Sequence, residues 1–115
     1  MIRYLLALFL SIQAYASSLS LVAITHHACP VCLKWQKEVE PFYHLYVKKQ
    51  DYPELKRYDV SKIENRHWVR DHVGPLTSLP TFALMKNDQV ITSFHGYLNA
   101  QDFFQVLDDA LEKPD

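Results

Sequence analysis

The two cysteines of this chain, Cys29 and Cys32, lie three residues apart, and a largely apolar run at residues 21–25 ends shortly before them. That run shows no alternation of polar and apolar residues, which predicts a buried strand. Pro30 suits the first turn of a helix, where the N–H that it lacks would have no partner. A strand that leads into Cys-X-X-Cys at the start of a helix is typical of a dithiol redox site.

Length and composition limit the chain to one ordinary globular domain. Its 115 residues are enough for one small domain and too few for two. The apolar content of 49% is typical of a globular protein. Charges of both signs are mixed along the chain, with a formal net charge of −1 and no basic stripe, so we expect no nucleic-acid partner. Two cysteines are too few for a disulfide scaffold.

Residues 1–16 have the three parts of a secretory signal peptide. Arg3 supplies a positive start, an apolar run covers residues 4–12, and Ala14 and Ala16 are the small residues expected before a cleavage site. The run is shorter than the about 20 residues that a membrane-spanning helix needs. The alternative is a buried first helix or strand. We expect a signal peptide over residues 1–16 and a soluble domain over residues 17–115 that is exported, most simply to a bacterial periplasm.

The order of predicted elements indicates an α/β fold. Hydrophobic periodicity predicts strands at residues 20–25, 55–60, 81–85 and 90–94, and helices at 31–47, 62–73 and from 100 onward. The first two strands should be parallel through a right-handed crossover, and the last two should form an antiparallel hairpin. The expected architecture is a four-stranded mixed sheet with helices on both faces.

Single residues refine the predicted helices. Pro41 should kink or split the first one. Ser61 and Glu64 have the spacing of a capping box for the second, and Asn99 is the expected N-cap of the last. Four aromatic residues are expected in the core, namely Trp35, Phe42, Phe103 and Phe104.

Three motifs at matching spacing give the chain a resemblance to the thioredoxin superfamily. They are Cys29-Pro30-Val31-Cys32, then Leu79-Pro80-Thr81, and then a hairpin at residues 82–90 followed by Gly96-Tyr97. The resemblance covers residues 20–112 and implies a cis peptide bond before Pro80. Within the superfamily the chain looks most like the periplasmic thioredoxins of sulfur-oxidation gene clusters. That finer likeness depends on Trp35, Glu38-Val39, Pro41, Tyr43, Gly96-Tyr97 and residues 102–104.

The chain also departs from the typical thioredoxin pattern. The dipeptide between the cysteines is Pro-Val, and Ala28 stands where an aromatic residue or glycine is usual. The first strand lacks the buried aspartate that thioredoxin places behind its dithiol, and the extra amino-terminal strand and helix are missing. Both directions of electron flow therefore stay open: a reductant of protein disulfides, which we favour, or a disulfide-forming oxidant.

The expected chemistry assigns one role to each cysteine. Cys29, at the helix start, is the expected nucleophile, because free backbone N–H groups and the helix dipole stabilise a thiolate there. Cys32, one turn later, is the expected resolving thiol. His26 or His27 could lower the pKa of Cys29 further. An extended substrate could pair with the backbone beside Pro80. The expected substrate rim comprises Leu79, Pro80, Pro30, Val31, Gly96 and Tyr97.

Such an enzyme needs no cofactor and no metal. Its expected partners are protein disulfides and a membrane electron donor or acceptor, and we expect a monomer. Two other interpretations of the cysteine pair stay open. It could be a purely structural disulfide, although so short a loop constrains the unfolded chain little. It could also form a copper or zinc site together with His26 and His27, as in a metal chaperone.

Several other polar residues have simpler expected roles. Asp59, near the end of the second strand, could carry protons, but a turn or capping role is the stronger expectation. Three further histidines are expected at the surface, namely His44, His67 and His72.

Overall fold

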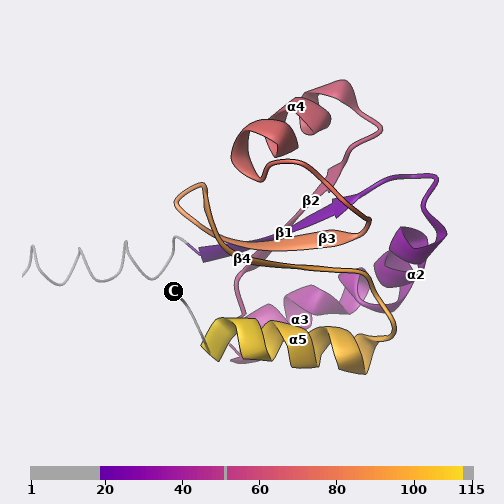
Figure 1. Ribbon diagram of the computed structural model, residues 1–115. Coiled ribbons are helices and arrows are strands. Elements are labelled where there is room, and N and C mark those ends of the chain that lie inside the picture. Colours follow the sequence, from indigo (N-terminus) through magenta and orange to yellow (C-terminus); the bar gives the residue numbers. More distant parts are fainter. Residues whose placement is uncertain (1–18, 51, 113–115) are drawn as a thin grey trace, which may run out of the picture.

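The computed structural model describes residues 19–50 and 52–112, and Figure 1 shows their arrangement. The elements follow the order strand, two helices, strand, helix, two strands, helix. Their bounds are β1 Leu19–Thr25, α2 Pro30–Glu38, α3 Glu40–Gln50, β2 Glu54–Asp59, α4 Ile63–His72, β3 Thr81–Lys86, β4 Gln89–His95 and α5 Ala100–Glu112. The predicted signal peptide lies outside the described residues.

The four strands form one mixed sheet in the order β2-β1-β3-β4. β1 runs parallel to β2, with Thr25 opposite Asp59, and antiparallel to β3, with Ile24 opposite Thr81. β3 and β4 form the antiparallel hairpin. Helix α4 covers one face of the sheet, and α2, α3 and α5 cover the other (Figure 1). The predicted architecture is confirmed.

The core has two layers because side chains along a strand alternate between faces. On the side of α2, α3 and α5, Leu21 and Ala23 pack with Trp35, Phe82 and Phe103. On the side of α4, Val22 and Ile24 pack with a smaller set, namely Val60, Val69, Ala83 and Met85. β1 is therefore buried on both faces, which explains why its sequence shows no alternation.

The predicted first helix is split in two at Val39. The Val39 N–H donates to the Trp35 carbonyl at 2.8 Å, and the Val39 carbonyl accepts the N–H groups of Phe42 and Tyr43, both at 3.0 Å. Pro41 lies in the first turn of α3, where its missing N–H leaves no bond unmade. The break that Pro41 predicts is confirmed.

The expectation that Phe42 is buried is wrong. Val39 and Tyr43 are fully buried, whereas the Phe42 side chain is 53% exposed. The buried stripe of α3 continues from Val39 at four-residue spacing, and Phe42 lies beside it. Trp35 and Phe103 are buried as expected, and Phe104 is partly buried against the same cluster.

A cluster of aromatic rings packs α3 and α5 against the segment before β2. The Tyr43, Tyr52 and Phe104 rings stack with centroids 5.9–6.3 Å apart. The Tyr43 hydroxyl donates to the Pro53 carbonyl at 2.9 Å, and the Tyr52 hydroxyl donates to Asp108 Oδ1 at 2.5 Å. Burial, and next the neighbouring Tyr52, raise the pKa of Tyr43.

The ends of the remaining helices follow turn chemistry. The predicted capping box at Ser61 is wrong, because Lys62 is the N-cap of α4 and its side chain makes no capping bond. Asp59 sets this turn instead, since its Oδ1 accepts the Ser61 N–H at 2.9 Å and its carbonyl accepts the Asn65 amide at 3.0 Å. Asn99 does cap α5, with its Oδ1 accepting the Asp102 N–H at 2.8 Å.

The β3–β4 turn has Asn87 and Asp88 at φ +52° and +65°, the left-handed pair of a two-residue hairpin.

Among the described helices, none combines the length and the apolar character needed to cross a bilayer.

The difference in burial between Phe42 and Phe103 predicts opposite outcomes for their replacement. Replacing Phe42 with serine should change the free energy of unfolding by no more than about 0.5 kcal/mol, because its side chain is exposed. Phe103→Ala should cost about 3–5 kcal/mol, because it opens a cavity among buried rings. Urea unfolding of the oxidised protein measures both. A cost of more than about 2 kcal/mol for Phe42→Ser would contradict the exposed position of Phe42.

Candidate functional site

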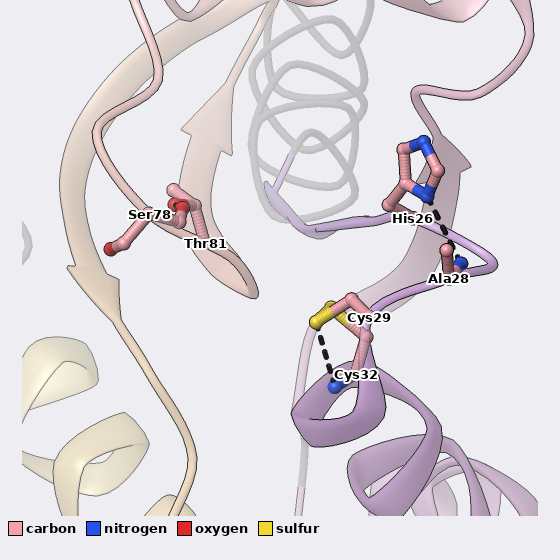
Figure 2. The surroundings of a disulfide bond; sticks show 6 residues. All are labelled: His26, Ala28, Cys29, Cys32, Ser78 and Thr81. Atoms are coloured by element: carbon pink, nitrogen blue, oxygen red, sulfur yellow. Dashed lines mark hydrogen bonds between the residues drawn. A yellow bond between two sulfur atoms is a disulfide. The ribbon is translucent and has the colours of Figure 1, made fainter.

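Cys29 is the N-cap residue of α2, and its sulfur is the capping acceptor. Its backbone is extended, with φ −90° and ψ 110°, and its Sγ accepts the Cys32 N–H at 3.1 Å (Figure 2). Pro30 occupies the first helical turn, as its sequence position predicts. Because the first N–H groups of a helix lack partners within it, this sulfur meets one of them and lies at the positive end of the helix dipole.

The two cysteines form a disulfide, with their Cα atoms 5.2 Å apart. Their exposure differs, since Cys32 is fully buried and Cys29 is partly exposed. An attacking group in solution can thus approach the sulfur of Cys29 more readily than that of Cys32. The asymmetry matches the roles expected for a nucleophilic and a resolving cysteine.

The loop between β1 and α2 holds Cys29 from the other side. The Cys29 N–H donates to the His26 carbonyl at 3.0 Å, and the Ala28 N–H donates to His26 Nδ1 at 3.0 Å. The His26 and His27 rings stack at 4.7 Å. His26 Nδ1 is thus occupied by a backbone donor, so this ring has a part in shaping the loop. An effect of either histidine on the pKa of Cys29 stays a prediction.

The Leu79–Pro80 peptide bond is cis, as the resemblance implies. Pro80 is buried, and its carbonyl accepts the Gly96 N–H at 2.8 Å. This places Gly96, at the end of β4, beside the segment that opens β3. Figure 2 draws the neighbouring Ser78 and Thr81 in the surroundings of the disulfide. The Thr81 hydroxyl is 2.7 Å from the Ser78 carbonyl and 3.0 Å from His95 Nδ1.

The loop after β4 is tied to α2 by side chains that sequence reasoning missed. The Tyr97 hydroxyl donates to Glu38 Oε1 at 2.6 Å, and Lys34 Nζ donates to the Leu98 carbonyl at 2.8 Å. Lys34 also lies 5.8 Å from the centre of the Tyr97 ring. Burial, and next the bond to Glu38, raise the pKa of Tyr97. No sequence motif links residues about 60 positions apart, so no signal for these contacts was available.

The surface beside the dithiol is partly apolar. Val31 is 41% exposed on α2, and Leu98 is 65% exposed on the loop that α2 holds. Behind this loop, a depression of about 380 Å³ lies between the end of β4 and α5, lined by residues that include His95, Tyr97 and Asp102. Of the expected rim, Pro30 and Val31 come from α2, Leu79 and Pro80 from the segment before β3, and Gly96 and Tyr97 from the loop after β4.

Other polar candidates have structural surroundings. Asp59 Oδ1 accepts the Ser61 N–H, which confirms its role in a turn, and this bond lowers the pKa of Asp59. His72 stacks on Trp68 at 4.4 Å, and its Nδ1 lies 2.9 Å from the Trp68 carbonyl. Within residues 19–50 and 52–112, no group of three or more His, Cys, Asp and Glu side chains could hold a metal ion.

Comparison with known proteins identifies the fold. No protein-family model and no curated protein sequence matches the chain. Among solved structures, the reduced periplasmic thioredoxin SoxS from Paracoccus pantotrophus aligns with a TM-score of 0.68 and 23% identity, over 84% of this chain and 99% of that one. The oxidised thioredoxin from Plasmodium falciparum aligns with a TM-score of 0.57 and 21% identity, over 86% and 88%.

A thioredoxin-fold protein from Helicobacter pylori also aligns, with a TM-score of 0.62 and 15% identity, over 80% of this chain and 68% of that one. At these identities the likeness concerns the fold. The chain has the thioredoxin fold, with a Cys-X-X-Cys pair at the start of α2.

The lowered pKa of Asp59 predicts how one turn responds to acid. A carboxylate with a lower pKa in the folded state stabilises the fold above its unfolded pKa, and loses that contribution as pH falls through the folded value. Asp59→Asn should therefore lower the free energy of unfolding at pH 7, and its difference from wild type should shrink as pH falls and the Asp59 carboxylate takes up a proton. Urea unfolding across this pH range measures it. A difference that stays constant with pH would show that the charge of Asp59 contributes nothing.

Proposed function

We propose that this protein is an exported thiol–disulfide oxidoreductase that reduces disulfides in periplasmic proteins. The observation that supports it best is the position of Cys29. Cys29 is partly exposed at the N-cap of α2 and its sulfur accepts the Cys32 N–H, while Cys32 is buried one turn away. A backbone donor and the helix dipole at the same sulfur favour a thiolate, the reactive form in disulfide exchange.

The reaction has two exchange steps. The Cys29 thiolate attacks one sulfur of a substrate disulfide, the substrate S–S bond breaks, and the departing sulfur takes up a proton. Cys32 then gives up its proton and attacks the Cys29 sulfur. The mixed disulfide breaks, and the second substrate sulfur leaves and is protonated. Two electrons have passed to the substrate, and Cys29 and Cys32 are joined as a disulfide.

The surroundings of Cys29 suit a protein substrate. The Leu79–Pro80 segment and the Gly96–Tyr97 loop are connected by the bond from Gly96 N–H to the Pro80 carbonyl. Val31 and Leu98 add exposed apolar surface. A substrate chain in an extended conformation would pair with the backbone beside Pro80 and cover this apolar surface.

Export, electron supply and the monomeric state belong to the proposal. Residues 1–16 have the sequence of a signal peptide, and one solved structure that aligns with this chain is a periplasmic thioredoxin. In that compartment the oxidised pair would be recharged by a membrane electron donor, and nothing in the reaction needs a bound cofactor.

Trapping the mixed disulfide tests the assignment of the two cysteines. Cys32→Ser keeps the attacking thiol and removes the resolving one, so covalent adducts with exported proteins should accumulate and disappear on treatment with dithiothreitol. Cys29→Ser is the matched control and should give none. Non-reducing electrophoresis followed by mass spectrometry of residue 29 measures both.

The proposal fails if Cys32→Ser forms no adducts, or forms as many as Cys29→Ser does. It also fails if the reduced wild-type protein binds Cu(I) tightly and does not reduce insulin, since that outcome supports the metal-carrier alternative.

The equilibrium potential of the pair distinguishes a reductant from an oxidant. We expect equilibration with glutathione to give a value near the thioredoxin end of the range, about −270 mV, which favours electron donation to substrates. A value near −120 mV would instead support a disulfide-forming oxidant. Thiol alkylation at a series of glutathione ratios measures it.

A further inference from the structure

The hydroxyl of Thr81 joins the end of β4 to the segment that precedes β3. Its Oγ1 lies 2.7 Å from the carbonyl of Ser78 and 3.0 Å from Nδ1 of His95. Thr81 is 2% exposed, and it lies opposite His95 in the pairing of β3 with β4. His95 is exposed on the outer strand of the sheet.

Counting protons fixes the direction of both bonds. A carbonyl oxygen only accepts, so the single proton of the Thr81 hydroxyl goes to Ser78. The hydroxyl oxygen must then accept at its other contact, and His95 Nδ1 must be the donor. The neutral His95 ring therefore has its proton on Nδ1 and leaves Nε2 as an acceptor.

These bonds hold the segment before β3 at Ser78, and a bond from Gly96, just after β4, holds it at Pro80. The Ser78 carbonyl is held by Thr81, and the Pro80 carbonyl is held by the N–H of Gly96 at 2.8 Å. Leu79 lies between these two fixed points. Within the described ranges, no backbone hydrogen bond involves Leu79, so its N–H and carbonyl have no backbone partner in this structure.

The brace lies on the side of the sheet away from α2. Thr81 pairs with Ile24, and the next residues of β3 on the same face are Ala83 and Met85, which pack in the layer under α4. Cys29 and Cys32 belong to α2, which covers the opposite face (Figure 1). The arrangement suits a support for the segment rather than a group that acts on sulfur.

We propose that Thr81 and His95 are positioning residues that hold the Leu79 backbone ready to pair with the extended chain of a protein substrate. This inference rests on the proposed function and deepens it. The two side chains act through the Ser78–Pro80 segment and do not touch the reacting sulfurs. Removing either side chain should therefore slow the reduction of substrates that offer a peptide strand and leave the reduction of small disulfides unchanged.

The test compares two variants with two substrates. Thr81→Val removes the hydroxyl at nearly constant shape, and Thr81→Ser keeps it. With insulin as substrate, Thr81→Val should lower kcat/KM about tenfold, mainly through a higher KM, as expected for losing one hydrogen bond and leaving its partners unsatisfied. With 5,5′-dithiobis(2-nitrobenzoic acid), its rate should stay within about twofold of wild type, because no strand pairing is involved. Thr81→Ser should match wild type with both.

His95 supplies an independent readout. In the wild-type protein, ¹⁵N chemical shifts should show the neutral ring protonated at Nδ1, and Thr81→Val should shift the proton towards Nε2. His95→Phe, a change at an exposed position, removes the donor while Thr81 keeps its bond to Ser78. Its loss with insulin should therefore be smaller than that of Thr81→Val. Should Thr81→Val fold poorly, His95→Phe is compared with wild type instead: a loss with insulin but not with the small disulfide supports the inference, and no loss with insulin overturns it.

Two outcomes overturn the inference. One is a Thr81→Val variant that reduces insulin as well as wild type does; the other is an equal loss with insulin and with the small disulfide. If the wild-type protein reduces neither substrate, the proposed function itself is wrong. If the wild-type protein reduces insulin and Thr81→Val reduces it equally well, only the present inference is wrong.

Discussion

Burial of β1 on both faces is the constraint on which the rest of the structure depends. Every residue from Leu21 to Thr25 is buried. A strand of this kind needs neighbours on both edges and helices on both faces, because its backbone groups and side chains have no access to water. β2 and β3 supply the edges, and α4 on one side with α2, α3 and α5 on the other supply the cover. The location of the cysteine pair follows from this burial, since the chain leaves β1 and enters α2 after a short loop.

The site is assembled from short segments that are each held by polar contacts at their ends. His26 shapes the loop before Cys29, Gly96 and Thr81 fix the segment around Leu79, and Glu38 and Lys34 hold the loop after β4. The contacts between Glu38 and Tyr97 and between Lys34 and Leu98 join α2 to that loop. The helix that presents Cys29 and the loop that borders it therefore form one unit.

Sequence reasoning predicted the parts of this fold that depend on local pattern. The strands, the split at Pro41, the cap at Asn99 and the Cys-X-X-Cys pair at a helix start follow from periodicity, turn chemistry and spacing. It failed where a second local arrangement competed. Ser61 and Glu64 match a capping box, yet Asp59 already binds the Ser61 N–H; and periodicity carried through Pro41 placed Phe42 in the core. The cis bond before Pro80 was available only through the family resemblance. Contacts such as Thr81 with His95 depend on strand pairing, and no short motif encodes them.

The bond from the Cys32 N–H to the Cys29 sulfur is present while the two cysteines are joined. The donor that would stabilise a thiolate at residue 29 is thus already oriented before any electron arrives. Preorganised dipoles of this kind lower the reorganisation that accompanies a change of charge. Under the proposed function, the Cys32 N–H would therefore need no reorientation when the disulfide is reduced.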